Sequence, residues 1–170
     1  MRTQVLVISG SMGCGKTTVL GEASDILSGH DILHAAIDLD AVGAVSVPEE
    51  VASGLAQRNL AAIYANFVNA GVKHVLLAEA VETRADLDGL CGAMPGADFV
   101  ICRLTAAPAT MERRLRVREP GMHQERFVSR ARELQSVLDA AKLEDFTVLN
   151  DERTVTDVAR EVLNRAGWIE

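Results

Sequence analysis

The stretch Gly10–Thr18, with the sequence GSMGCGKTT, decides how this chain folds. It follows the apolar run Val5–Ile8 and leads into a segment with the apolar spacing of an amphipathic helix. Its glycines let the backbone bend tightly and direct successive N–H groups at one point, in conformations that a Cβ would obstruct. A strand, a glycine-rich turn and a helix in this order are typical of a phosphate-binding site.

The spacing Gly10-x-x-x-x-Gly15-Lys16-Thr17 matches the P-loop pattern at every position. In this pattern the lysine contacts the β- and γ-phosphates and the hydroxyl ligates Mg²⁺, so we expect Lys16 to be catalytic and Thr17 to be a metal ligand. The alternative is a glycine-rich turn with a chance Lys-Thr, which is rare in a chain of this length. The expected nucleotide-binding residues of the loop are Gly10, Ser11, Met12, Gly13, Cys14, Gly15, Lys16, Thr17 and Thr18.

Short apolar runs alternate with helical patterns along all 170 residues, which predicts an α/β fold with a parallel sheet and helices on both faces. No linker or internal repeat divides the chain, and its length suits one buried core, so we expect a single domain over residues 1–170. The expected strands are Gln4–Ser9, Leu33–Asp38, His74–Glu79, Asp98–Leu104 and Phe146–Leu149.

Helices are expected between these strands. The first begins at Lys16, one or two lie between residues 48 and 71 with Gly54 as a break, and the last begins near Thr154, which has capping-box spacing to Asp157. Two more flank the break at Pro120-Gly121, and their expected ranges are Thr105–Glu119 and Glu125–Ala141.

The composition limits the classes of partner. A net charge of −7 and a pI of about 5.1 disfavour binding to a nucleic-acid backbone, which needs many clustered cations. The three cysteines, Cys14, Cys91 and Cys102, have neither the number of a disulfide framework nor the spacing of a zinc site. No apolar run has the length of a membrane span or the form of a signal peptide. We therefore expect a cytoplasmic monomer or homodimer that interacts with neither nucleic acid nor membrane.

Two aspartates close the second expected strand. Residues two apart on a strand project to the same side, so Asp38 and Asp40 should both face the ligand site at the carboxyl end of the sheet. A carboxylate there can hold a water of the Mg²⁺ shell or accept the proton of an attacking hydroxyl. The alternative interpretation is a solvated, turn-forming pair of aspartates.

A third carboxylate, Glu79, ends the next expected strand in the form of an apolar run followed by an acid, as the metal-linked carboxylate of P-loop enzymes does. The alternative is that Glu79 caps the helix that follows. Arg84 comes five residues later and either reaches into the same cleft or lies exposed at the start of that helix.

The segment Met111–Gly121 is unusually rich in arginine for an acidic chain. Guanidinium groups stack on bases and bind phosphates in a bidentate manner, so a helix, a break and a second helix here could close over the P-loop as a lid. The alternative is a solvated helical face paired with the neighbouring glutamates. The arginines of the segment are Arg113, Arg114, Arg116 and Arg118, of which Arg114 and Arg118 share one face.

With these parts in place, the sequence resembles the small P-loop kinases, the group that contains shikimate kinase, gluconate kinase, adenylylsulfate kinase and the nucleoside monophosphate kinases. Three motifs carry the resemblance: GSMGCGKTT, the IDLD at 37–40 and the ERRLRVREPG at 112–121. The resemblance implies a three-layer αβα fold with a five-stranded parallel sheet in the order 2-3-1-4-5, and a short helical lid over about 113–130.

The resemblance also implies roles for individual residues. Asp38 would lie near Mg²⁺, and Asp40 would bind or deprotonate the acceptor hydroxyl. Arg114 would lie against adenine, and Arg118 would contact the transferred phosphoryl group as a catalytic residue. The expected residues on the acceptor side are Asp40, Arg58, Glu79, Arg84 and Arg130.

The acceptor side departs from the known members. The third strand leads into AEAVET, where shikimate kinases carry a glycine triplet, so the chain resembles an unassigned branch of the group. We expect an ATP- and Mg²⁺-dependent kinase that acts on a hydroxyl or similar oxygen of a small molecule. The alternative is a P-loop protein that only binds ATP or hydrolyses it slowly. A regulatory GTPase is disfavoured because the Asp-x-x-Gly match at 86–89 falls on an expected helix.

Overall fold

The computed structural model describes residues 2–43, 54–118, 121–122 and 124–170. Its five strands form one parallel sheet in the order β2-β3-β1-β4-β5, which confirms the predicted fold class and strand order. The strand that leads into the phosphate loop therefore lies at the centre of the sheet. The strands are β1 (Gln4–Gly10), β2 (His34–Asp38), β3 (His74–Ala78), β4 (Asp98–Thr105) and β5 (Phe146–Leu149).

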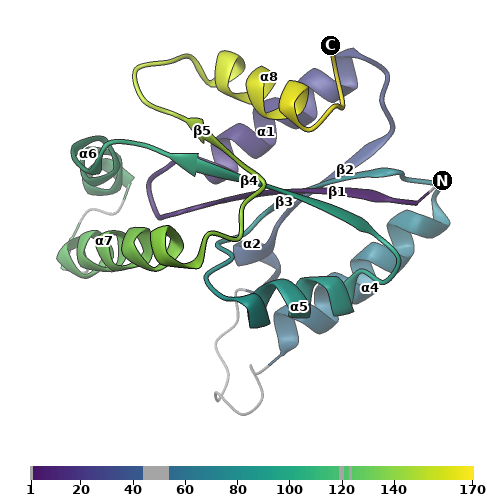
Figure 1. The fold of residues 1–170 in the computed structure, drawn as a ribbon, viewed down its shortest axis with the longest axis horizontal. Coiled ribbons are helices and arrows are strands. Elements are labelled where there is room, and N and C mark those ends of the chain that lie inside the picture. The colour runs from purple at the N-terminus through teal and green to yellow at the C-terminus, as the bar shows by residue number, and fades with distance from the viewer. Residues whose placement is uncertain (1, 44–53, 119–120, 123) are drawn as a thin grey trace.

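The helices connect the strands as in a doubly wound α/β fold (Figure 1). Within the described residues they are α1 (Lys16–Gly29), α2 (Leu39–Gly43), α4 (Leu55–Asn69), α5 (Arg84–Ala93), α6 (Pro108–Arg118), α7 (Gln124–Ala141) and α8 (Val155–Arg165).

Alternation along β1 divides the core into two layers. Leu6 and Ile8 belong to the cluster that packs against α1 and α8, while Val5 and Val7 belong to the cluster that packs against α4 and α5. All four side chains are fully buried, as expected for a central strand covered on both faces. Figure 1 shows α1 and α8 on one side of the sheet and α4 and α5 on the other.

Helices α6 and α7 pack on the phosphate loop. Leu115 of α6 joins Val128 and Ala131 of α7 in a small buried cluster, and Met12 of the loop packs against it. The expected lid range of 113–130 therefore covers the end of α6 and the first part of α7, next to the loop.

Three expected boundaries and the placement of Asp40 are corrected by the structure. β2 ends at Asp38 as expected, but Asp40 does not continue the strand, because the Asp38 carboxylate accepts the Asp40 N–H at 3.2 Å and Leu39 turns into the core to begin α2. β3 ends one residue before Glu79, although the Glu79 N–H still donates to the Ile8 carbonyl. Thr105 is the last residue of β4 rather than part of a helix, and α6 begins at Pro108, which suits a first helical position.

The region between residues 48 and 71 holds one described helix. α4 begins after Gly54, whose φ of 68° lies in the left-handed region, so this glycine forms the start of the helix. The remainder of the expected helical segment, up to residue 53, lies outside the described residues.

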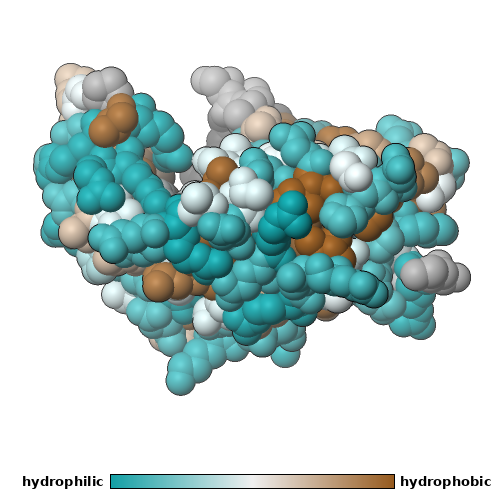
Figure 2. All heavy atoms as spheres, turned by 90° about the horizontal axis from the view of Figure 1, so that it is seen from above, coloured by the Kyte–Doolittle hydropathy of each residue, from teal (hydrophilic) through white to brown (hydrophobic). Residues whose placement is uncertain are grey.

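Figure 2 views the molecule from the side of α1 and α8, where the surface is mostly hydrophilic, with a larger hydrophobic area right of centre and several smaller ones. Among the described helices, none combines the length and the apolar character that a membrane crossing requires.

Candidate functional site

The glycines of the phosphate loop are required by close approaches of backbone and side chains. Gly10, Gly13 and Gly15 have φ values of 143°, 79° and 101°, in the region that residues with a Cβ rarely adopt. A Cβ at Gly10 would lie 2.6 Å from the Leu104 carbonyl oxygen, and one at Gly15 would overlap the Asn150 side-chain amide. The loop is thus held between the ends of β4 and β5.

Lys16 extends back across the loop. Its Nζ donates to the carbonyl oxygens of Gly10 at 3.0 Å and Ser11 at 3.4 Å, which places the positive charge over the turn. Lys16 is also the first residue of α1, so the partial positive charge of the helix N-terminus acts on the same place. A lysine, the backbone amides of the loop and a helix N-terminus are together suited to bind phosphate groups.

Buried polar contacts fix the loop from two sides. The Ser11 Oγ donates to the Ala131 carbonyl of α7 at 2.7 Å, and the Asn150 side-chain amide donates to the Cys14 carbonyl at 2.7 Å. Arg114 spans the gap between them, donating to the carbonyls of Gly13 at 3.4 Å and Asn150 at 3.1 Å. These bonds set the direction of the loop carbonyls and hence of the adjoining N–H groups.

Three other loop positions differ in exposure. Met12 is half-buried against the α6–α7 cluster, and Thr18 is exposed on α1. Cys14 is fully buried, and burial raises the pKa of its thiol above the ordinary value, so this thiol is unsuited to act as a nucleophile.

A hydroxyl and a carboxylate meet beside the loop. The Thr17 Oγ1 donates to the Asp38 carboxylate at 2.7 Å, and Asp38 also accepts the Asp40 N–H. Within the described residues no three Asp, Glu, His or Cys side chains converge as metal ligands. Mg²⁺ commonly takes one or two protein oxygens together with substrate phosphates and water, so the Thr17–Asp38 pair fits this ion.

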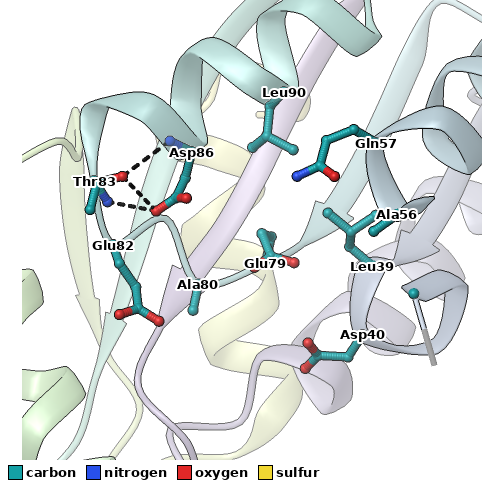
Figure 3. Close-up of a pocket in the computed structure, with 11 residues that line it drawn as sticks. Leu39, Asp40, Ala56, Gln57, Glu79, Ala80, Glu82, Thr83, Asp86 and Leu90 are labelled. Atoms are coloured by element: carbon teal, nitrogen blue, oxygen red, sulfur yellow. Dashed lines mark hydrogen bonds between the residues drawn. The ribbon is translucent and has the colours of Figure 1, made fainter. Parts of the chain in front are cut away.

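Next to this pair the surface is hollowed into a cavity of about 560 Å³. In Figure 3, Leu39 and Asp40 of α2 stand on one side of it, Thr83 and Asp86 on the other, and Glu79 lies between them. Asp40 therefore reaches the cleft from the first turn of α2 rather than from a strand. The cavity is lined by Leu39, Asp40, Gly43, Ala56, Gln57, Glu79, Ala80, Glu82, Thr83, Asp86 and Leu90.

Glu79 has a strongly perturbed carboxyl group. Burial, followed by the negative charge of Asp40, raises its pKa to about 7, while the Ala80 N–H and Lys16 act in the opposite direction. The alternative interpretation, that Glu79 caps α5, is not what the structure shows: Thr83 and Asp86 form that capping box. A carboxyl with such a pKa in a cleft is a candidate functional group.

Three arginines of α6 have different surroundings. Arg114 contacts the phosphate loop, as described above, and Arg118 is the exposed last residue of α6. Arg116 instead pairs with Glu112 and Glu125, in the manner of a solvated helical face.

Arg130 lies at the edge of the cavity. Its guanidinium donates to both carboxylate oxygens of Glu82, at 2.7 and 2.8 Å, and also pairs with Glu133. Since Glu82 lines the cavity, this ion pair, in which one guanidinium nitrogen donates to both carboxylate oxygens, joins α7 to the wall of the cleft.

The two other expected acceptor cations flank the cavity without lining it. Arg58 follows the lining residue Gln57 on α4, and Arg84 follows the lining residue Thr83 at the start of α5, where it is exposed. The structure thus brings Asp40 and Glu79 together at the hollow and leaves Arg58 and Arg84 at its margin.

Two residues of the site were not anticipated in these roles. Asn150 directly follows β5, and a polar residue at the carboxyl end of a strand next to the phosphate loop was a usable signal for its contact with the loop. No local sequence pattern predicts the role of Glu82 in the cavity wall, because its partner Arg130 is 48 residues away in the chain.

No family model matches the sequence, and no curated protein matches it either. Solved structures do match over nearly the whole chain. A sugar kinase from Janibacter sp. HTCC2649 is 18% identical, with a TM-score of 0.65 and coverage of 97% of this chain and 95% of that chain.

Two further matches were solved with ligands. The Mycobacterium tuberculosis APS kinase in complex with AMPPNP and APS is 19% identical, with a TM-score of 0.65 and 98% coverage of each chain. The shikimate kinase from Acinetobacter baumannii in complex with shikimate is 16% identical, with a TM-score of 0.63 and coverage of 96% of this chain and 93% of that chain. The chain therefore has the fold of the small P-loop kinases.

Proposed function

We propose that this protein is an ATP-dependent kinase that transfers a phosphoryl group to a hydroxyl or similar oxygen of a small molecule. One observation carries the proposal: the cavity opens directly beside the phosphate loop, and hydrogen bonds link Thr17 of the loop through Asp38 to Asp40 at its wall. A phosphate donor on the loop and an acceptor in the cavity would thus be neighbours.

In the proposed reaction the acceptor oxygen attacks the γ-phosphorus of ATP. The new O–P bond forms while the bond from that phosphorus to the β,γ-bridging oxygen breaks, and ADP leaves. The proton of the hydroxyl passes to Asp40 or to water. Lys16 neutralises charge on the β- and γ-phosphates, and Asp40 orients the hydroxyl as well as accepting its proton.

Mg²⁺ is proposed at the Thr17–Asp38 pair, where it would neutralise charge on the nucleotide phosphates. The pair fits because it offers one hydroxyl and one carboxylate beside the loop, leaving most of the shell to phosphate and water.

The lid is proposed as residues of about 113–130, a range whose described part includes the end of α6 and the start of α7. Arg114 already lies against the loop and the Asn150 carbonyl, which is where we place the adenine. Arg118 would contact the transferring phosphoryl group, since a guanidinium binds phosphate oxygens in a bidentate manner. Arg130 acts at the acceptor side through Glu82. We place the activity in a single cytoplasmic domain that works as a monomer or homodimer.

The ligands of similar structures support a two-substrate site. The APS kinase was solved with both AMPPNP and APS, and the shikimate kinase with shikimate. A nucleotide and a small acceptor are therefore accommodated together on this fold.

The test is acceptor-dependent release of ADP. Wild-type protein with Mg²⁺ and ATP is screened against pooled polyols, sugars, sugar acids, nucleosides, amino alcohols and antibiotics, with Lys16→Ala as the blank. The proposal expects at least one pool to raise ADP formation well above the rate without acceptor, with a phosphorylated product in the mass spectrum. AMPPNP binding without any such pool would favour the alternative, a protein that binds ATP or hydrolyses it slowly.

A further inference from the structure

The wall of the acceptor cavity carries an unusual balance of charge. Four of its described lining residues are acids, and none is lysine or arginine. The site itself is located by the hollow and by its place beside the phosphate loop. The charge of the acids indicates which kind of molecule the cavity suits. These acids are Asp40, Glu79, Glu82 and Asp86.

Three of the four acids already have partners, and for Glu79 the partner is the Ala80 N–H. Glu82 is bound by the Arg130 guanidinium, and Asp86 accepts the Thr83 N–H at 2.8 Å and the Thr83 hydroxyl at 2.9 Å. The Asp40 carboxylate differs, because within the described residues it accepts no hydrogen bond and forms no ion pair. Asp40, with Glu79 beside it, is the charge that a bound molecule would meet (Figure 3).

The absence of lysine and arginine from the lining is not caused by basic residues that the structure leaves undescribed. All 17 of these residues in the sequence fall within the part of the chain that the structure describes. The segment 44–53, whose sequence is AVSVPEEVAS, lies outside the described residues and contains no lysine or arginine. Arg130 is engaged by Glu82 and Glu133, and Arg58 and Arg84 stand outside the lining.

A metal ion is a poor explanation for the acids. Their side chains line different sides of a hollow of about 560 Å³, and the described residues hold no group of three acids, histidines or cysteines spaced as metal ligands. Dispersed carboxylates around a cavity of this size suit an organic molecule, which presents its charges and hydroxyls at separate points.

We propose that the acceptor of this kinase carries a protonated amine as well as the hydroxyl that is phosphorylated, as an amino sugar or amino alcohol does. The inference rests on the proposed function, since it assigns the chemical class of the molecule in the acceptor cavity. An ammonium group can donate charge-assisted hydrogen bonds to Asp40 and Glu79, whereas an anionic acceptor is repelled by the negative charge of these carboxylates. APS and shikimate, the acceptors bound in the two neighbours, are both anions.

Ligand-observed NMR tests the inference without requiring turnover. The full chain, saturated with AMPPNP and Mg²⁺, is mixed at one pH and one ionic strength with a library of small polyhydroxy compounds, matched in size and divided equally into amines, neutral compounds and carboxylates. We expect hits to be at least several-fold enriched in amines. The best amines should bind about 10-fold more weakly to Asp40→Asn and normally to Asp88→Asn, an exposed acid on α5 outside the lining.

The converse test adds a positive charge to the cavity wall instead of removing a negative one. Gln57 lines the cavity from the exposed side of α4, so Gln57→Lys should fold and should shift the hits from amines toward carboxylates. Enrichment of carboxylates or neutral compounds with the wild type, or amine hits unaffected by both variants, would overturn the inference. So would a library without hits.

The two proposals fail differently. Amines that bind in the cavity and are never phosphorylated by Mg²⁺ and ATP contradict the kinase function and leave the class of ligand intact. A carboxylate that is phosphorylated efficiently contradicts the class of ligand and leaves the kinase function intact.

Discussion

The phosphate loop and the cavity beside it differ in the kind of group that each offers to a ligand. On the proposed phosphate side the groups that would face a ligand are backbone amides and one lysine, and buried contacts such as Ser11 to Ala131 and Asn150 to Cys14 hold the loop. On the acceptor side they are side chains, and the central one, Asp40, is exposed on a short helix. A backbone cradle recognises phosphate in any molecule, whereas side chains select one molecule. The difference explains how a fold can keep one donor site and change its acceptor.

The largest effect expected on the phosphate side comes from Lys16→Ala. The substitution should reduce phosphoryl transfer at least about 10³-fold, because it removes the charge that neutralises the β- and γ-phosphates. Its melting temperature without nucleotide should stay near that of the wild type, since the hydrogen bonds of the Nζ within the described residues are those to two carbonyl oxygens of the loop. Lys73→Ala, at an exposed lysine, is the control. Wild-type transfer in Lys16→Ala would end the kinase proposal.

The matching test on the acceptor side is Asp40→Asn. It keeps the shape and removes the proton acceptor, so transfer should fall by about 10² to 10⁴-fold while AMPPNP still binds. Asp38→Asn should act through Mg²⁺, so raising the metal concentration should restore part of the loss at Asp38 and none of the loss at Asp40. Initial rates across a magnesium series measure both. If Asp40→Asn retains full activity, Asp40 is not at the acceptor.

The phosphate loop could be predicted from the sequence, whereas much of the acceptor cavity could not. The phosphate side follows from local order along the chain: a strand, the glycines at fixed spacing, then Lys16 and Thr17 at the start of a helix. The alternation of Val5–Ile8 between two core layers is equally local in origin. The strand order pairs segments far apart in the chain, and it was predicted from the resemblance to the small P-loop kinases.

The acceptor side depends on contacts between distant segments. Asp40 was predicted to project from a strand, but burial of Leu39 and the bond from the Asp40 N–H to Asp38 start a helix there. The Glu82–Arg130 pair joins residues 48 apart, which no periodicity in one sequence reveals. For the same reason Arg58 and Arg84 were expected in the cavity and lie beside it.

A moderate effect is expected where the phosphate loop is fixed by Asn150. Asn150→Ala leaves the buried Cys14 carbonyl without its donor, which should weaken AMPPNP binding about 10-fold and lower the free energy of unfolding by about 1–3 kcal/mol. The KM for ATP should rise more than kcat falls, because the loop is misplaced before the reaction begins. Ser136→Ala, at an exposed serine of α7, is the control. A change in stability without any change in nucleotide affinity would assign Asn150 a purely structural role.

The smallest effect expected concerns the acceptor side without any ligand. The pKa of Glu79 in the folded protein, about 7, lies above the value of 4.5 expected for an unfolded chain, so the folded state binds the proton more tightly. The contribution of Glu79 to stability is therefore fully present below about pH 4.5 and is lost as the pH rises through 7. After allowance for the solvent that still reaches the group, the loss should be about 1–2 kcal/mol.

Urea unfolding at pH 5 and pH 8 should show this difference in stability in the wild type and not in Glu79→Gln. Asp40→Asn should reduce the difference, because the Asp40 charge contributes to the raised pKa of Glu79. Asp88→Asn on α5 should leave it unchanged. An equal pH dependence in wild type and Glu79→Gln would show that the acceptor cavity stores no such electrostatic strain, and the contrast between its two halves would then rest on the phosphate loop alone.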